Sequence, residues 1–246
     1  MQEKSDSSPW PGVAAVFGAG GGIGGALCAQ LMAEGCEVWA GSRSGAVAGL
    51  AGARQFAFDL EDEGALAAAA AAMHDAPPDL VIVATGVLTL PDGTGPERSY
   101  KAIDGAAMDQ VFRLNTMGPA LVAKHMLPLF PRDRRALFAA LSARVGSIGD
   151  NRIGGWHSYR ASKAALNMLL RNFAIELGRT HPLAVVAGLH PGTVDTGLSA
   201  PFQRGLPEGQ LTSTAASAAH LLKVCRALSA ADSGGVFDWR GKRIDP

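Results

Sequence analysis

Residues 13–25 read VAAVFGAGGGIGG, which is five apolar residues followed by a run of glycines. The apolar part, 13–17, is typical of a buried strand, and a helical apolar pattern follows at 26–34. Glycines between a strand and a helix let the backbone turn tightly and approach a pyrophosphate, which then lies at the positive end of the helix. No G-K-[ST] follows them, which excludes a nucleoside triphosphate P-loop. The stretch therefore predicts a dinucleotide-binding turn.

The rest of the chain alternates short apolar runs with helical patterns. We expect strands at 36–40, 55–58, 80–84, 136–141, 184–189 and 236–238, and helices at 61–73, 108–127, 159–178 and 213–229. The apolar runs are continuous rather than alternating, which indicates strands covered on both faces. This predicts an α/β fold, a single doubly wound parallel sheet (a Rossmann fold) with helices on both faces, in one domain over 1–246.

Composition narrows the classes of partner. The 22 basic and 22 acidic residues give a formal net charge of zero, which argues against nucleic acid or an anionic membrane. The three cysteines and six histidines show no metal-ligand spacing, so we expect no metal. The start, MQEKSDSSPWPG, has no apolar signal core, and a cytoplasmic location is expected.

Tyr159 and Lys163, in YRASK, lie one helical turn apart and share a helix face. An ammonium beside a phenol favours the ionised phenol, so the pair predicts a lowered tyrosine pKa and proton exchange with a carbonyl or alcohol oxygen. Trp156 and His157 precede this pair. Their position suits either of two roles, forming a wall of the substrate pocket or packing the loop.

The end of the second predicted strand decides the choice of dinucleotide. An acid there binds the ribose 2′-hydroxyl of NAD, whereas a basic residue accommodates the 2′-phosphate of NADP. Ser42 and Arg43 occupy this point without a carboxylate, which favours NADP(H) over NAD(H).

Taken together, these motifs resemble the short-chain dehydrogenase/reductase family over about 13–239. The matching elements are GAGGGIG, Asp59 after the third strand, Asn115 in VFRLN, YRASK and PGTVDT. The stretches LSARVGSIGDNRIGGW and SKAALNMLLRNFAIEL, and the ending SGGVFDW, are similar to its C-factor-like, sniffer-type branch.

The resemblance implies hydride transfer between a nicotinamide and a small carbonyl or alcohol substrate. It makes Tyr159 the general acid/base, with Lys163 binding the nicotinamide ribose, Asn115 holding a relay water and a serine contacting the substrate oxygen. It also implies that 193–212 caps the substrate pocket, and that a homodimer or homotetramer forms through the two long helices. The other residues implied to bind the cofactor are Gly18, Gly22, Ile23, Gly24, Asp59, Leu60, Ala84, Gly86, Pro191, Gly192, Thr193, Val194 and Thr196.

The chain departs from the family pattern at three places. The N-N-A-G motif reads VATG at 83–86, and Phe17 replaces the threonine before the glycine loop. In S-x-x-G, Ala143 occupies the catalytic serine position, so we assign the role to Ser142, one residue early, with Ser147 as the alternative. These departures leave a second hypothesis open, a dinucleotide-binding signalling or regulatory protein with little turnover.

Overall fold

The computed structural model describes residues 10–204, 207 and 209–246; residues 205, 206 and 208 of the expected capping segment lie outside this description, as do 1–9. A central eight-stranded sheet has the order β10-β9-β6-β5-β4-β1-β2-β3. Neighbouring strands are parallel except for β10 against β9. The strands are β1 (Val13–Phe17), β2 (Glu37–Ser42), β3 (Arg54–Ala57), β4 (Leu80–Val83), β5 (Ala136–Leu141), β6 (Ala184–His190), β9 (Val236–Asp238) and β10 (Arg243–Ile244).

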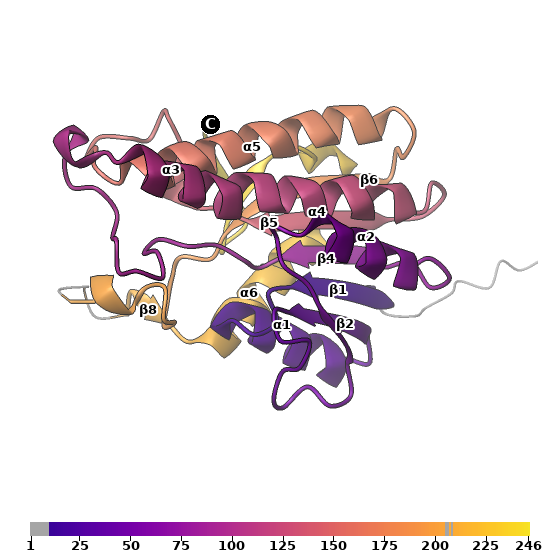
Figure 1. Cartoon of the computed structure of the whole chain (residues 1–246). Coiled ribbons are helices and arrows are strands. Elements are labelled where there is room, and N and C mark those ends of the chain that lie inside the picture. Colours follow the sequence, from indigo (N-terminus) through magenta and orange to yellow (C-terminus); the bar gives the residue numbers. More distant parts are fainter. Residues whose placement is uncertain (1–9, 205–206, 208) are drawn as a thin grey trace, which may run out of the picture.

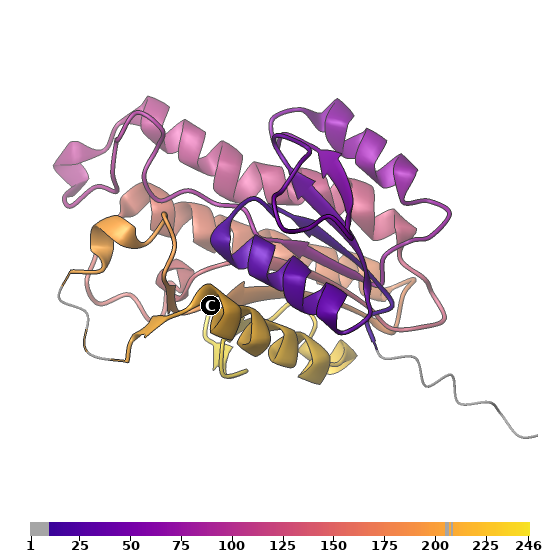
Figure 2. The ribbon, with the colours of Figure 1, turned by 90° about the horizontal axis from the view of Figure 1, so that it is seen from below.

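Helices cover both faces of the sheet, which confirms the predicted doubly wound α/β fold (Figure 1). One face carries α2 (Glu63–Ala72), α3 (Gly105–Phe112), α4 (Gly118–Met126) and α5 (His157–Gly178). The opposite face carries α1 (Gly22–Ala33) and α6 (Thr214–Ala227), which lie side by side in Figure 2. The chain leaves β1 toward β2 and β3 and later returns to its other side through β4, so the strand order reverses at β1 and β4. Ligands of such sheets bind at this reversal, beyond the carboxyl ends of the strands.

Each face of the sheet has its own buried cluster, which explains the continuous apolar strands. In β4, Leu80 and Ile82 pack with α1 and α6, while Val81 and Val83 pack with α2, α4 and α5. Both sets are fully buried. A strand buried on both faces gains free energy from every apolar side chain, about 1.5–3 kcal/mol for each large one.

The predicted helix at 108–127 is instead interrupted. A π-helical turn, Arg113–Met117, separates α3 from α4. Asn115, in this turn, accepts a hydrogen bond from Val87 N at 2.8 Å and donates one to Val87 O at 2.9 Å. The amide therefore ties the wide turn to the segment that follows β4, a long-range contact that helical periodicity does not reveal.

Phe17 has a structural role of its own. Its ring packs edge-on against Phe56 and Phe58, with centroids 5.3 and 5.1 Å apart. The departure from the family's threonine thus builds an aromatic cluster beneath the glycine turn.

Candidate active site

The glycine run turns between β1 and α1 as predicted. Gly18 has φ +103°, and the N–H groups of Gly18 and Ala19 donate to Gly41 O at 3.0 and 2.8 Å. A Cβ at Gly24 would collide with the carbonyl oxygen of Gly18, so only glycine permits this close packing. Over residues 10–204, 207 and 209–246, no side chain caps the start of α1, which leaves its N–H groups available to an anion.

A cleft of about 680 Å³ runs from this turn across the carboxyl ends of the strands. It brings together most of the residues that the sequence indicated: Gly22, Ile23, Ala84, Gly86, Ser142, Tyr159, Lys163, Pro191, Gly192, Thr193, Val194 and Thr196. The cleft also contains Thr85 and His190, which sequence reasoning did not assign to the site. Burial lowers the pKa of His190 to about 4, helped by nearby Arg144 and opposed by Asp238, so this ring is neutral at pH 7.

Six of the predicted cofactor residues lie outside the cleft lining: Gly18, Gly24, Ser42, Arg43, Asp59 and Leu60. Ser42 closes the end of β2 next to Gly20, whose Cβ would lie 3.6 Å from that of Ser42. Arg43 follows on the surface, and no ion pair engages it in the described part of the chain. Leu60 is buried against Gly118 at the start of α4.

Tyr159 and Lys163 lie together on the first turns of α5. The Lys163 ammonium is 5.8 Å from the Tyr159 ring centroid and donates to Leu141 O at 2.8 Å. Lys163 is buried, which lowers its pKa to about 8. Burial raises the pKa of Tyr159 to about 12, so the prediction of a lowered tyrosine pKa is wrong for the protein chain. The ammonium lies beside the ring and bonds a backbone carbonyl rather than the phenol oxygen.

Asn115 is completely buried behind this pair. Besides Val87, its Nδ2 donates to Ser162 Oγ at 3.2 Å, on the same helix as Tyr159 and Lys163. A Cβ at Gly86 would meet both Asn115 Oδ1, at 3.2 Å, and Lys163 Nζ, at 3.4 Å. Asn115 therefore joins the end of β4 to α5 at the level of the ammonium.

Neither serine considered for the substrate oxygen presents a free proton to the cleft. Ser142 Oγ donates to Asn167 Oδ1 on α5 at 2.6 Å. Ser147 Oγ donates to Pro246 O at 3.5 Å and accepts from Asp150 N at 3.0 Å, which holds a loop. Ala143, which also lines the cleft, offers no hydroxyl. We expected the Ser142 hydroxyl to point at the substrate, but its proton is instead donated to Asn167.

Trp156 begins α5 in the left-handed conformation, with φ 52° and ψ 43°. Its ring lies between Tyr159 and Phe202, at centroid distances of 6.3 and 5.2 Å. Phe202 belongs to the expected capping segment, whose two ends are joined by the short parallel strands β7 (Thr193–Val194) and β8 (Leu211–Thr212). Trp156 is therefore a wall between Tyr159 and this segment, and its strained backbone marks a constrained position.

Glu97 holds the start of α5 in place. Its carboxylate accepts the Ser158 N–H, at 3.2 Å to Oε2, and the Ser158 hydroxyl, and its carbonyl accepts the Trp156 N–H. Burial acts to raise the pKa of Glu97, but the hydrogen bonds from Ser158 outweigh it and leave that pKa lowered. Sequence reasoning missed Glu97, because a lone acid in a loop carries no pattern.

A parallel sheet with a glycine turn and a Tyr–Lys pair in one cleft defines a Rossmann-fold oxidoreductase site. The sequence profile of the short chain dehydrogenase family matches residues 12–206. The chain belongs to this family, and it is an oxidoreductase that acts on CH–OH or C=O groups.

Relatives support the predicted branch. C-signal of Myxococcus xanthus is 34% identical over 142 residues, 58% of this chain and 80% of that protein. A 1-hydroxy-2-glutathionyl-2-methyl-3-butene dehydrogenase of Rhodococcus is 37% identical over 101 residues, 41% of this chain and 43% of that protein.

Solved structures share the fold across the chain. The NADPH-bound carbonyl reductase from chicken fatty liver superposes with a TM-score of 0.80 at 24% identity and covers 96% of this chain and 94% of its own. The carbonyl reductase Sniffer of D. melanogaster gives 0.81 at 19% identity, with 96% and 99% covered. A putative short-chain dehydrogenase/reductase of Burkholderia multivorans with bound NADP gives 0.79 at 26%, with 95% and 99% covered. Within the described residues, no helix has the length and apolarity needed to cross a membrane.

Proposed function

We propose that this protein is an NADPH-dependent reductase that converts a small carbonyl compound to the alcohol. The observation that carries the proposal is the pairing of Tyr159 with the buried ammonium of Lys163 in the cleft that starts at the glycine turn. The purified protein should oxidise NADPH in the presence of carbonyl compounds, and a Tyr159→Phe variant should not.

The cleft fits a dinucleotide on three observations. The glycine cradle at Gly18 and Gly24 has no room for side chains. Thr85 Oγ1 is buried and finds no hydrogen-bond partner among the described residues. Lys163 Nζ carries three N–H donors, and in the described part of the chain they meet one acceptor, Leu141 O. Gly18, Gly22, Ile23 and Gly24 would hold the pyrophosphate, Asp59 and Leu60 the adenine, Ala84, Gly86 and Lys163 the ribose, and Pro191, Gly192, Thr193, Val194 and Thr196 the nicotinamide.

NADP(H) is proposed over NAD(H) because of the residues that end β2. Ser42 ends the strand and Arg43 follows it, without an acid at either position, and an exposed guanidinium suits a 2′-phosphate. The chicken and Burkholderia structures are described with NADPH and NADP bound, which supports the same choice.

When bound, the nicotinamide would supply the hydride; the protein supplies and positions a proton. Because burial raises the pKa of Tyr159 to about 12, its phenol is protonated at neutral pH and ready to donate. Tyr159 is the hydrogen-bond donor proposed for the carbonyl oxygen, since the Ser142 proton is bonded to Asn167. Lys163 stabilises the phenolate that forms.

Asn115 acts in this proposal by holding the backbone of Val87 beside α5. Its role as the holder of a relay water stays a prediction. The segment 193–212 would cap the substrate, with the tilted rings of Trp156 and Phe202 in contact where the two meet.

We further propose a homodimer or homotetramer through α4 and α5. Met117, on the π-helical turn, and Met168 and Ile175, on α5, expose 50%, 61% and 48% of their surface and would supply apolar contacts to a partner subunit. A cytoplasmic location is consistent with Cys28, Cys36 and Cys225, which are free and buried.

The signalling hypothesis is separated from this proposal by one variant. A binding-only protein needs no proton donor, so its biological effect should survive Tyr159→Phe. Loss of that effect together with turnover would support the enzyme.

A further inference from the structure

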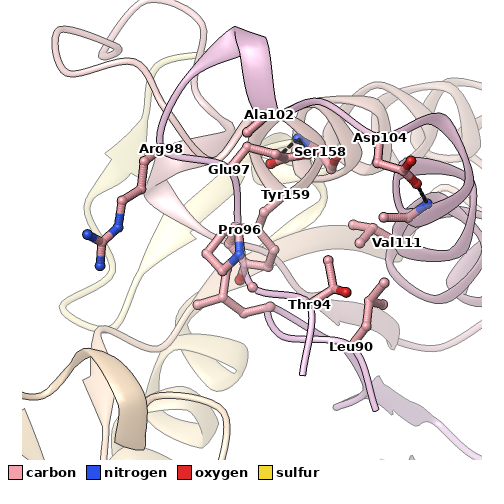
Figure 3. Close-up of a pocket in the computed structure, with 13 residues that line it drawn as sticks. Leu90, Thr94, Pro96, Glu97, Arg98, Ala102, Asp104, Val111, Ser158 and Tyr159 are labelled. Atoms are coloured by element: carbon pink, nitrogen blue, oxygen red, sulfur yellow. Dashed lines mark hydrogen bonds between the residues drawn. The ribbon is translucent and has the colours of Figure 1, made fainter. Parts of the chain in front are cut away.

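A second cavity lies on the far side of Tyr159 from the dinucleotide cleft. The segment between β4 and α3 folds over the start of α5 and leaves a space of about 390 Å³ (Figure 3). Leu88 and Tyr159 line both this cavity and the cleft. A carbonyl held at the Tyr159 phenol therefore has room for substituents in two directions.

The cavity walls are mainly apolar. Leu88, Leu90 and Val111 are 6%, 4% and 6% exposed, and Pro96, Ala102 and Ala107 add further apolar surface to the lining. At about 30 Å³ for each water-sized volume, the space holds roughly a dozen non-hydrogen atoms. Such a lining binds hydrocarbon and gives a polar group little to bond.

The two carboxylates at the cavity already accept hydrogen bonds from the protein. Glu97 bonds the start of α5 through Ser158, and Asp104 accepts the Ala107 N–H at 2.8 Å at the start of α3. Arg98 extends away from the hollow in Figure 3. Two carboxylates at the wall, with the guanidinium turned outward, disfavour an anionic substituent.

Resting on the proposed reductase activity, we propose that the substrate is a ketone whose second substituent is an uncharged apolar arm that enters this cavity. In the reaction, the carbonyl carbon gains a hydride from NADPH, which becomes NADP⁺. The C=O π bond opens, and the oxygen takes the Tyr159 proton, which solvent later replaces. The product is a secondary alcohol.

The test uses phenyl n-alkyl ketones whose alkyl arm grows from methyl to hexyl. With the intact protein and NADPH, kcat/KM should rise about fourfold for each methylene buried, up to the size of the cavity. A terminal carboxylate on the hexyl arm should lower kcat/KM at least about tenfold relative to the methyl ester. A flat series, or a faster carboxylate, would overturn the proposal.

Two variants fill the cavity. Ala107→Phe places a ring on its α3 wall, and Thr94→Phe does so from an exposed loop position, where folding is least at risk. Each should remove the gain from the long arm and leave phenyl methyl ketone reduced at nearly the original rate. The matched control is Ala106→Phe, which is exposed and absent from the cavity lining. Equal losses for short and long ketones, or the same effect in Ala106→Phe, would contradict a subsite here.

Calorimetry measures ketone binding without turnover, so it separates a failure of the proposed subsite from a failure of the proposed reductase activity. Phenyl hexyl ketone should bind at least about tenfold more weakly to Ala107→Phe than to the original protein, whether or not turnover occurs. Binding of this kind without NADPH oxidation would support the subsite and contradict the proposed reductase activity. Turnover without dependence on arm length would do the reverse.

Discussion

Ser142 and Asn167 form a closed pair: the serine hydroxyl donates to the asparagine Oδ1 at 2.6 Å, from the end of β5 to the middle of α5. The pair joins the strand to the helix that carries Tyr159. It also explains how this chain can have a serine at the cleft without a serine proton for the substrate.

Ala143→Ser should therefore raise activity. A hydroxyl at the family's catalytic position adds one hydrogen bond to the carbonyl oxygen, and about 1 kcal/mol corresponds to a fivefold gain in kcat/KM. Ser142→Ala should instead lower the free energy of unfolding by about 1 kcal/mol, because it leaves the half-buried Asn167 oxygen without its partner. A hundredfold loss of kcat in Ser142→Ala with unchanged stability would show that Ser142 is catalytic after all.

Arg43→Ala should weaken NADPH binding roughly 10- to 100-fold, since it removes a charged hydrogen-bond donor from the 2′-phosphate. NADH affinity should stay the same. Fluorescence titration with both dinucleotides measures this, and Arg179→Ala, at the far end of α5, is the control. Similar affinities of the original protein for NADPH and NADH would disprove the preference.

The pH dependence should differ between the two directions. Reduction needs protonated Tyr159, whose pKa is raised to about 12, and charged Lys163, whose pKa is lowered to about 8. Reduction should thus be level from pH 6 to about 7.5 and fall above pH 8 as Lys163 loses its proton. Oxidation needs the phenolate and should rise at up to about tenfold per pH unit while Lys163 stays charged. A reduction rate that falls already between pH 6 and 7.5 would contradict these pKa values.

Glu97→Gln should lower the free energy of unfolding by about 1 kcal/mol at pH 7, because a charged cap on the start of α5 is replaced by a neutral one. The folded-state pKa of Glu97 is lowered, so its stabilisation is present above the usual pKa of 4.5 and is lost as the pH falls through the folded value. Urea unfolding at pH 7 and pH 4 should show the difference shrinking, whereas Glu176→Gln, an exposed change further along α5, should show little at either pH. A difference that persists at low pH would mean that charge is not the cause.

The strands were predictable because burial on both faces leaves an apolar run, and 13–17, 136–141 and 236–238 match β1, β5 and β9. The helix α1 begins four residues earlier than expected, at Gly22. A phosphate-binding turn requires a helix to start there, but glycine has a low helix propensity, so the sequence pattern does not reveal this start. The break at 113–117 depends on the Asn115–Val87 bonds across 28 residues, which no local pattern contains.

The site was predictable where motif spacing fixes geometry, as at the Tyr159–Lys163 pair. It was not predictable where a side chain chooses a distant partner. Ser142 bonds Asn167, 25 residues away, and Glu97 bonds Ser158, 61 residues away. The raised pKa of Tyr159 also comes from burial, which only the folded chain defines.

The most direct test is NADPH oxidation by the purified protein across aldehydes, ketones and diketones, with Tyr159→Phe measured beside it. Loss of a positioned proton donor should reduce kcat by about 10²- to 10⁴-fold while NADPH affinity is retained. That result would establish Tyr159 as the proton donor of a carbonyl reductase. NADPH binding with no turnover, or turnover that Tyr159→Phe leaves unchanged, would contradict the account.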